Sequence, residues 1–504
     1  MSDLLEKAEP VPSDREDRPP TRRHLLTVGA AAAAVALIAP VRASAQVVVR
    51  PHTRRPPPPP ATGDALLRLV RRITNGVTEE ELTRAKSLGF TRYLEYHLNP
   101  TAIDDVAAAT FVTTNYPALG LDGTSLYQQE QNPLFNQLCE STLYRAAFSK
   151  RQLYERMVEF WTAHFNIYYP KVNYLKVLDD RDVIRKHALG KFPDMLRASA
   201  YSPAMLEYLD NTRSRNRNVN QNYARELMEL HTLGVDGGYT QTDVEQVTLC
   251  LTGWTIAGRS NFNFDSGGHD FTPKTVLGTA LPPSGPGAAG VQDGERVLDI
   301  LLAHPSTAKF ISTKMIRWLL RYDPPAALVD KVAATFTRTG GDIPSMIRDI
   351  LTQANLLAAP AKYRQPYQLV VAALRATRPT LTSLTQVTPR QLDILGQRLF
   401  LWEDPDGYPD NVDWWAGTVL QRWNFANFLT GLTTGTLIVD VAPLMQVNTP
   451  AGIAEAINKR AFAGEMPASL KTRITAYLAA APITVSRVRE AFALALGSSS
   501  FQWF

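Results

Sequence analysis

The sequence predicts a mainly α protein: a multi-helix globular body with one long excursion, rich in Gly, Pro and aromatic residues, that has room for a short hairpin. Apolar residues recur at helical spacing over most of the chain from Asp64 to Phe504. The long stretch that lacks this spacing runs from Ala257 to Gly294. The composition, with 45% hydrophobic and 20% charged residues, is ordinary for a soluble globular protein.

Residues 1–45 have the pattern of a removable signal peptide. Paired arginines, Arg22 and Arg23, precede an apolar stretch, and Ala43-Ser44-Ala45 matches a small-x-small cleavage site. The apolar stretch has about fifteen residues, whereas a membrane-spanning helix needs about twenty. The arginine pair favours the twin-arginine route, although an uncleaved amphipathic leader is the alternative. We therefore expect a periplasmic or extracellular protein with no stable membrane span after cleavage.

Residues 46–63 are expected to form a proline-rich linker. Five consecutive prolines, Pro56 to Pro60, favour an extended polyproline helix. A spacer is the simpler role in an exported protein, and a ligand for a proline-reading domain is the alternative. Because the twin-arginine route carries folded proteins, a metal or cofactor can be bound before export.

The helical body is predicted to span residues 64–380. Its first helix follows Asp64, and Thr78 is expected to cap the second. Further helices follow over 140–169, 180–211 and 305–354, and glycine and proline break the second of these ranges. The apolar stripe of the first helix consists of Leu66, Leu67, Val70 and Ile73.

Residues Asn222 to Val235 are predicted to form a single helix. Arg225 and Glu229 are expected to pair on its solvated face, where Glu226 also lies. Two glycines, Gly237 and Gly238, are expected to end it, and Thr240 to cap the next helix in a capping box with Asp243. The apolar face of the helix consists of Ala224, Leu227, Met228, His231 and Val235.

Two segments outside the regular helices carry functional residue types. The excursion at 257–294 is expected to lie on the surface, and long ordered loops of this kind tend to carry function. The C-terminal helical part, 381–504, contains an aromatic insert at 403–415. Its residues are those of a carbohydrate-binding groove, and a turn pinned by buried tryptophans explains them equally well. They are Asp404, Asp406, Tyr408, Trp414 and Trp415.

Charge and cysteine content exclude two classes of protein. The net charge of +5 arises from 53 basic and 48 acidic residues without a long basic run in the body, so no nucleic-acid-binding surface is expected. Two cysteines are too few for a disulfide-stapled fold. Cys250 lies in an apolar run and is expected in the core, while a single bridge to Cys139 remains open.

The segments "RMVEFWTAHFN", "SPAMLEYLDN", "NYARELMELHTLGVDGGYTQTDV", "LTGW", "HPSTAKFISTKMIRWL" and "DGYPDNVDWW" occur in this order. Together they resemble the bacterial domain of unknown function 1800 family from about Asp64 to Phe504. The resemblance implies an exported, largely helical protein, often encoded beside a second exported family that would be its partner. The family has no agreed activity, so it supplies no catalytic residues. Gln221 departs from the glutamate that is usual there.

Two histidines define the candidate site. His164 and His231 both lie on apolar helix faces, and carboxylates and amides from Asp210, Asn211 and Glu226 can converge on them. We expect the two imidazoles to lie within about ten ångströms of each other in such a buried centre. The candidate catalytic residues are therefore His164, His231, Glu226 and Asp210. Core histidines with separate backbone partners are the simpler alternative.

A divalent metal is the cofactor that these residue types would hold. The histidine and glutamate spacing in 222–235 matches neither a di-metal helix nor a zinc protease motif, so any ligands must come from several segments. The candidate ligands are His164, His231, His269 and Asp270, the last two reaching over from the excursion.

Two functions follow from these observations. One is an exported envelope enzyme with a buried histidine–carboxylate site, metal-assisted if a metal binds. The alternative is a non-catalytic envelope protein that binds a partner or a glycan through the excursion and the aromatic insert. No nucleophile elbow, Walker loop, dinucleotide fingerprint or CxxC pair is present in the sequence.

Overall fold

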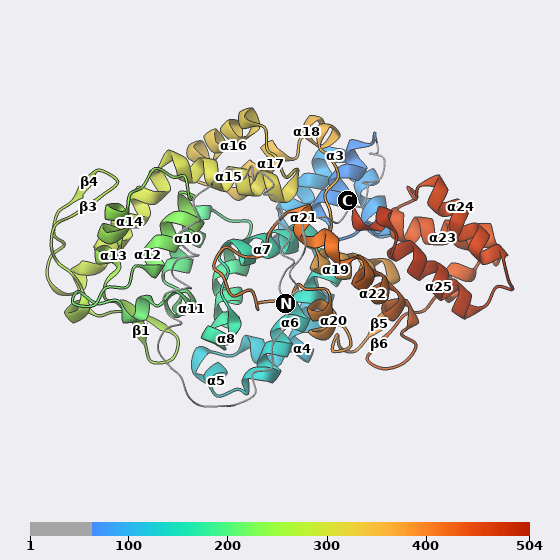
Figure 1. The fold of residues 1–504 in the computed structure, drawn as a ribbon, viewed down its shortest axis with the longest axis horizontal. Helices are drawn as coiled ribbons and strands as arrows, with labels where there is room; N and C mark the ends of the chain where they lie inside the picture. The colour runs from blue at the N-terminus through green and yellow to red at the C-terminus, as the bar shows by residue number, and fades with distance from the viewer. Residues whose placement is uncertain (1–62) are drawn as a thin grey trace, which may run out of the picture. The chain divides into compact units, whose positions relative to one another are not determined.

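Helices account for most of the chain (Figure 1). The computed structural model describes residues 63–504, and over that range it confirms the mainly α class. The predicted signal peptide and almost all of the predicted linker lie outside the described residues. The described residues fall within one compact unit, Pro51–Phe504.

The first two helices begin at side-chain caps. The Asp64 carboxylate accepts hydrogen bonds from the N–H groups of Leu66 and Leu67 at the start of α2 (Ala65–Ile73). Thr78 accepts from the N–H of Glu81 at the start of α3 (Glu79–Leu98), which confirms the predicted cap. The next helices are α4 (Val106–Asn115), α5 (Gly123–Tyr127), α6 (Gln131–Phe148), α7 (Gln152–His164), α8 (Tyr169–Val172) and α9 (Leu175–Leu178).

A π-helical turn, η3 (Asp179–Arg185), leads into the middle of the chain. After it come α10 (Phe192–Ala200), α11 (Pro203–Tyr208), α12 (Asn222–Glu226) and α13 (Gln241–Leu251). Prolines stand in the first turn of both α10 and α11, where a missing N–H has no helical partner to lose. The predicted capping box of Thr240 and Asp243 is confirmed at the start of α13.

The predicted single helix over 222–235 is partly wrong. It ends as an α-helix at Glu226 and continues as a π-helical turn, η5 (Leu227–Thr232). Glu226, just before η5, is buried, and Val235, beyond the end of η5, is 67% exposed. Arg225 donates to the Gln241 side chain rather than pairing with Glu229.

Two hairpins form at the excursion, where we expected a short hairpin, and the first begins at Trp254, before the predicted start of the excursion. The strands β1 (Trp254–Ala257) and β2 (Asn261–Phe264) pair antiparallel, as do β3 (Lys274–Val276) and β4 (Thr279–Leu281). Both β3 and the following α14 (Val291–Ala303) pack on α13. The excursion is therefore partly buried rather than wholly superficial: His269 and Lys274 are 1% and 3% exposed.

The remaining helices complete the fold. The first group is α15 (Pro305–Leu319), α16 (Ala326–Thr339), α17 (Ile343–Ile350) and α18 (Gln353–Ala358). The second group is α19 (Pro366–Thr377), α20 (Arg390–Ile394), α21 (Val412–Trp415), α22 (Val419–Gly431), α23 (Pro450–Phe462), α24 (Ala468–Ala479) and α25 (Val485–Leu496). A short pair, β5 (Thr380–Leu381) and β6 (Leu437–Ile438), joins two loops of this second group.

Two large apolar cores hold these helices. The first is built from buried residues between Leu67 and Ala359, and the second mainly from residues between Tyr367 and Phe501. The end of α6 contributes Leu143 to the second core. Cys250 is buried in the first core as predicted, and both Cys139 and Cys250 are free thiols, so the bridge left open by the sequence does not form.

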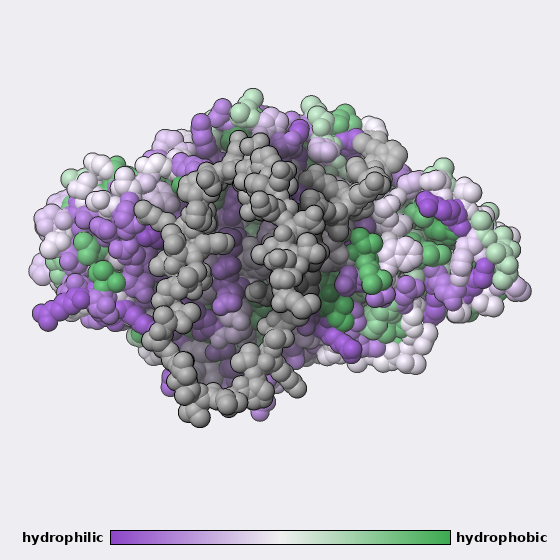
Figure 2. Space-filling model, in the orientation of Figure 1, coloured by the Kyte–Doolittle hydropathy of each residue, from purple (hydrophilic) through white to green (hydrophobic). Residues whose placement is uncertain are grey.

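The surface carries scattered apolar residues. On the face shown in Figure 2, hydrophobic residues form small groups among hydrophilic ones. Exposed large side chains include Trp414 and Leu420, at 42% and 67%. Within residues 63–504, no helix combines the length and the apolar character that crossing a bilayer requires.

Candidate functional site

His164 and His231 lie next to each other in the first core. Their ring centroids are 6.2 Å apart, well within the separation that we expected. His164 stands at the end of α7, and its Nε2 lies 3.2 Å from the backbone oxygen of His231 on η5. The other ring neighbours of His164 are aromatic: Phe160, Trp161, Phe165, Phe192 and Phe310.

Both histidines are neutral at physiological pH. Burial lowers the pKa of His164 well below its ordinary value, and it lowers the pKa of His231 to about 3. The Lys314 ammonium adds to both shifts. Within the described chain, Nδ1 of His164 and Nε2 of His231 have no hydrogen-bond partner. The pair is thus an uncharged, partly unsatisfied polar centre inside an aromatic cage.

The structure does not bring the predicted carboxylate and amide from the end of α11 to this pair. Asp210 turns outward in a left-handed conformation, and its Oδ2 lies 2.9 Å from Nζ of Lys171. The Asn211 amide donates to the backbone oxygens of Leu251 and Trp254, which ties η4 (Asn211–Arg213) to the start of β1. Asp210 and Asn211 therefore make contacts within their own part of the fold rather than with the histidine pair.

His269 and Asp270 serve the excursion itself. Nδ1 of His269 lies 2.7 Å from the oxygen of Thr252, and its Nε2 lies 3.4 Å from the Asp293 carboxylate. Asp293 also accepts from Nζ of Lys274 at 2.9 Å. This network fastens the hairpins to α13 and α14. Among residues 63–504, no three His, Cys, Asp or Glu side chains are grouped as metal ligands.

The aromatic insert is clamped onto the end of α7, beside the histidine pair. The Asn166 amide donates to the backbone oxygens of Trp402 and Asp404, at 3.0 and 2.8 Å. The Tyr208 hydroxyl, from α11, donates to the oxygen of Glu403 at 2.6 Å. Gly407 has a φ of 73°, and a Cβ there would lie 2.2 Å from the backbone oxygen of Ala163. We call residues 402–408 the acidic loop.

The acidic loop presents charged and aromatic groups to solvent. Asp404 and Asp406 are exposed, and the Trp402 indole N–H donates to Asp406 at 3.0 Å. The Trp402 ring contacts those of Tyr408 and Trp414, with centroids 4.7 and 5.9 Å apart. Trp415 is buried and donates to the oxygen of Pro409, as expected for a turn pinned by buried tryptophans, whereas Trp414 is exposed.

Lys314, on α15, faces both the histidine pair and the acidic loop. Burial lowers the pKa of its ammonium to about 8 and Asp406 acts against that shift. Its Nζ lies 5.5 Å from the centroid of the Phe310 ring, which in turn contacts His164. The side chain is half-buried, and no acceptor in the described residues forms a hydrogen bond with it.

Sequence reasoning missed Lys314. It stands in "HPSTAKFISTKMIRWL", one of the family-like segments, and reads there as an ordinary helix-surface lysine. The available signal was positional: four such segments meet here, carrying Asn166, Tyr208, Lys314 and Gly407. Convergence of separate segments on one place is typical of a site.

A second titratable group lies near the acidic loop. Burial raises the pKa of Glu159, one turn before Ala163 on α7, to about 7, against the effect of Arg156. The carboxylate accepts a hydrogen bond from Gln368 at 3.0 Å. The cavity that it lines, with Asn166 and Tyr408, has a volume of about 70 Å³. Small-molecule sites begin at about 300 Å³, so this cavity is too small for a substrate.

Comparison with known proteins identifies a family without an activity. A family model described as "Protein of unknown function (DUF1800)" matches residues 68–503. No curated protein and no solved structure matches the chain.

Proposed function

The chain belongs to the DUF1800 family, and on that premise we propose that it is an exported envelope enzyme in which Lys314 transfers a proton. The observation that carries the proposal is the placement of Lys314. It is a solvent-reachable amine of lowered pKa, set between Asp406 and two neutral histidines. Export rests on the paired Arg22 and Arg23 and the short apolar stretch after them.

A lysine with a pKa near 8 is suited to general acid–base chemistry. At pH 7 about one tenth of such a side chain is the neutral amine, whereas an ordinary lysine is almost wholly protonated. The neutral amine can accept a proton from a substrate O–H or C–H group, and the resulting ammonium can return it to the leaving atom. Asp406 is placed to stabilise that ammonium.

The histidine pair acts through Lys314 rather than on a substrate. Because burial keeps both imidazoles neutral, they lie near Lys314 without supplying a counter-charge. A carboxylate in their place would raise the pKa of Lys314 toward its ordinary value. We therefore assign His164 and His231 as positioning residues, in place of the predicted histidine–carboxylate centre.

The proposal is tested by turnover of activated substrates. Purified mature protein, Lys314→Met and Lys309→Met would be incubated with a panel of 4-nitrophenyl esters and glycosides. Lys309 lies on the same helix and is 63% exposed in an ion pair with Asp330, so it controls for the loss of one lysine from α15. We expect several equivalents of nitrophenolate from the wild type and Lys309→Met, and none from Lys314→Met. Equal release by Lys314→Met would contradict the proposal.

A glycan-binding role is the second candidate, and the exposed tryptophan favours it. Trp414 is 42% exposed and its ring is in edge contact with Trp402, beside two exposed aspartates. Aromatic faces beside carboxylates suit the apolar faces and hydroxyl groups of sugars. The test is binding of chito-oligosaccharides to the wild type, Trp414→Ala and Lys314→Met. This role would be favoured over the enzyme if Trp414→Ala abolishes binding, Lys314→Met leaves it intact, and the wild type shows no turnover.

A further inference from the structure

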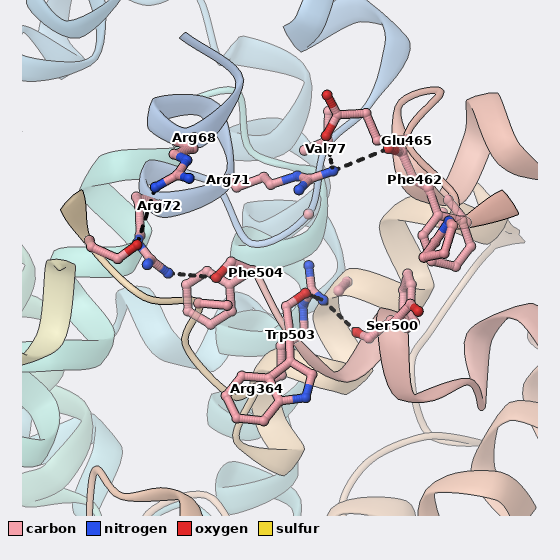
Figure 3. Close-up of a pocket in the computed structure, with 18 residues that line it drawn as sticks. Arg68, Arg71, Arg72, Val77, Arg364, Phe462, Glu465, Ser500, Trp503 and Phe504 are labelled. Atoms are coloured by element: carbon pink, nitrogen blue, oxygen red, sulfur yellow. Dashed lines mark hydrogen bonds and ion pairs between the residues drawn. The ribbon is translucent and has the colours of Figure 1, made fainter. Parts of the chain in front are cut away.

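A separate cavity of about 300 Å³ is lined by arginines (Figure 3). The helix α2 supplies three of them, Arg68, Arg71 and Arg72, because positions three and four apart share one helix face. The fourth, Arg364, precedes α19. The opposite wall comes from the end of α23 and from residues 500–504.

Positive charge exceeds negative charge in this cavity. Among the lining side chains there are four guanidinium groups and one carboxylate, that of Glu465, which lies 3.1 Å from Nη2 of Arg71. Arg72 and Arg364 are 4% and 8% exposed. Burial, together with neighbouring arginines, lowers the pKa of each to about 9. Buried cations without counter-charge are costly, and a bound anion would offset that cost.

Main-chain oxygens hold the arginines in place. Nη1 of Arg72 donates to the backbone oxygen of Phe504 at 2.6 Å, and Nη1 of Arg364 donates to that of Trp503 at 2.8 Å. Nη1 of Arg68 donates to the oxygen of Leu357 at 2.8 Å. No described residue accepts a hydrogen bond from Nε or Nη2 of Arg364. The guanidinium planes are thus fixed in advance, with donors left for a ligand.

The rest of the lining is apolar. Val77, Phe462, Phe501 and Trp503 line the cavity beside the arginines, and the first two and Trp503 are visible around it in Figure 3. A free inorganic ion would leave these surfaces uncovered. An organic anion would cover them with its carbon skeleton, which adds hydrophobic stabilisation.

We propose that this cavity binds a small organic anion, with its phosphate or carboxylate group at Arg72 and Arg364 and its apolar part against Phe462 and Trp503. Arginine is suited to both headgroups, because its planar fork matches two oxygens at once. The site is independent of Lys314, so either can exist without the other.

Calorimetric titration of the full-length mature protein tests the site. The probes are phenyl phosphate, benzoate, inorganic phosphate and phenol. We expect saturable binding of phenyl phosphate or benzoate, with weaker binding of inorganic phosphate and none of phenol. The tighter of the two aromatic anions identifies the headgroup. Binding should weaken as salt concentration rises, because part of the attraction is between charges.

Variants on the cavity rim make the assignment specific. Glu465→Gln removes the lining side-chain carboxylate and is expected to tighten phenyl phosphate binding about fivefold. Arg71→Gln removes one of the four guanidinium groups and should weaken binding about tenfold. Both side chains are partly exposed. Arg348→Gln, which removes an exposed ion-paired arginine elsewhere, should leave the affinity unchanged.

Either of two results would overturn the assignment. One is the absence of saturable heat with both aromatic anions at millimolar concentration. The other is equal affinity of the wild type and Glu465→Gln, since a ligand in this cavity must sense that charge. Arg364→Gln adds a direct test if the variant retains the helical circular dichroism of the wild type, and it should abolish binding.

Discussion

Buried neutral His231 should make the protein less stable in acid, by an amount that the structure fixes. Its pKa is lowered to about 3 in the folded chain and is about 6.5 when unfolded. Between these values the unfolded state binds more protons than the folded state, so stability is fully present above pH 6.5 and is lost as the pH falls toward 3. From pH 7.5 to pH 5 the expected loss from this one side chain is about 2 kcal/mol.

His231→Gln removes that titration while keeping a polar side chain of similar size. Urea unfolding of the wild type and the variant, followed by tryptophan fluorescence at pH 7.5 and pH 5, measures the difference. We expect the wild type to lose about 2 kcal/mol more than the variant between the two pH values. His187→Gln, at a half-buried histidine, should change the loss much less. An identical pH dependence in the wild type and His231→Gln would refute the neutral, buried state of His231.

Three further predictions concern the acidic loop, the thiols and export. Gly407→Ala should displace the acidic loop from Ala163 and lower the free energy of unfolding in urea. Gly396→Ala is the control, because Gly396 also has a positive φ but an added Cβ there would meet open space, and it should cost less stability. Equal costs would mean that the contact with Ala163 is unimportant. Cys139 and Cys250 should react with a thiol reagent in denaturant and not in the folded protein. Changing Arg22 and Arg23 together to lysine should leave unprocessed precursor in the cytoplasm, as followed by immunoblotting of cell fractions, and unchanged export would contradict the twin-arginine assignment.

Local patterns were enough to predict much of the fold. The caps at Thr78 and Thr240 form as expected because their signals involve residues three positions apart. The π-helical turn at Leu227–Thr232 was not predictable, since one extra residue in a turn leaves the apolar spacing almost unchanged. The burial of Glu226, which immediately precedes this turn, was missed as well.

The candidate site was predictable in part for the same reason. His164 and His231 each stand on an apolar helix face, and two such faces in one core come close together. Lys314 was missed because its lowered pKa depends on burial beside α7, η5 and the acidic loop, which are far apart in sequence. Asp210 pairs with Lys171 instead, and His269 contacts the backbone of Thr252. No local sequence pattern distinguishes a residue with such partners from one that joins a shared buried centre.

The reactivity of Lys314 tests the central claim most directly. The mature protein would be treated briefly with limiting acetic anhydride over a range of pH, and acetylation of each lysine followed by mass spectrometry. With a pKa near 8, Lys314 has about 300 times more neutral amine at pH 7 than an ordinary lysine. Lys362, also lowered to about 8, is 2% exposed and paired with Asp410, so it serves as the inaccessible control. We predict that Lys314 is acetylated first, with half-maximal rate near pH 8. A rate still rising above pH 10, as for the exposed Lys309, would contradict the account.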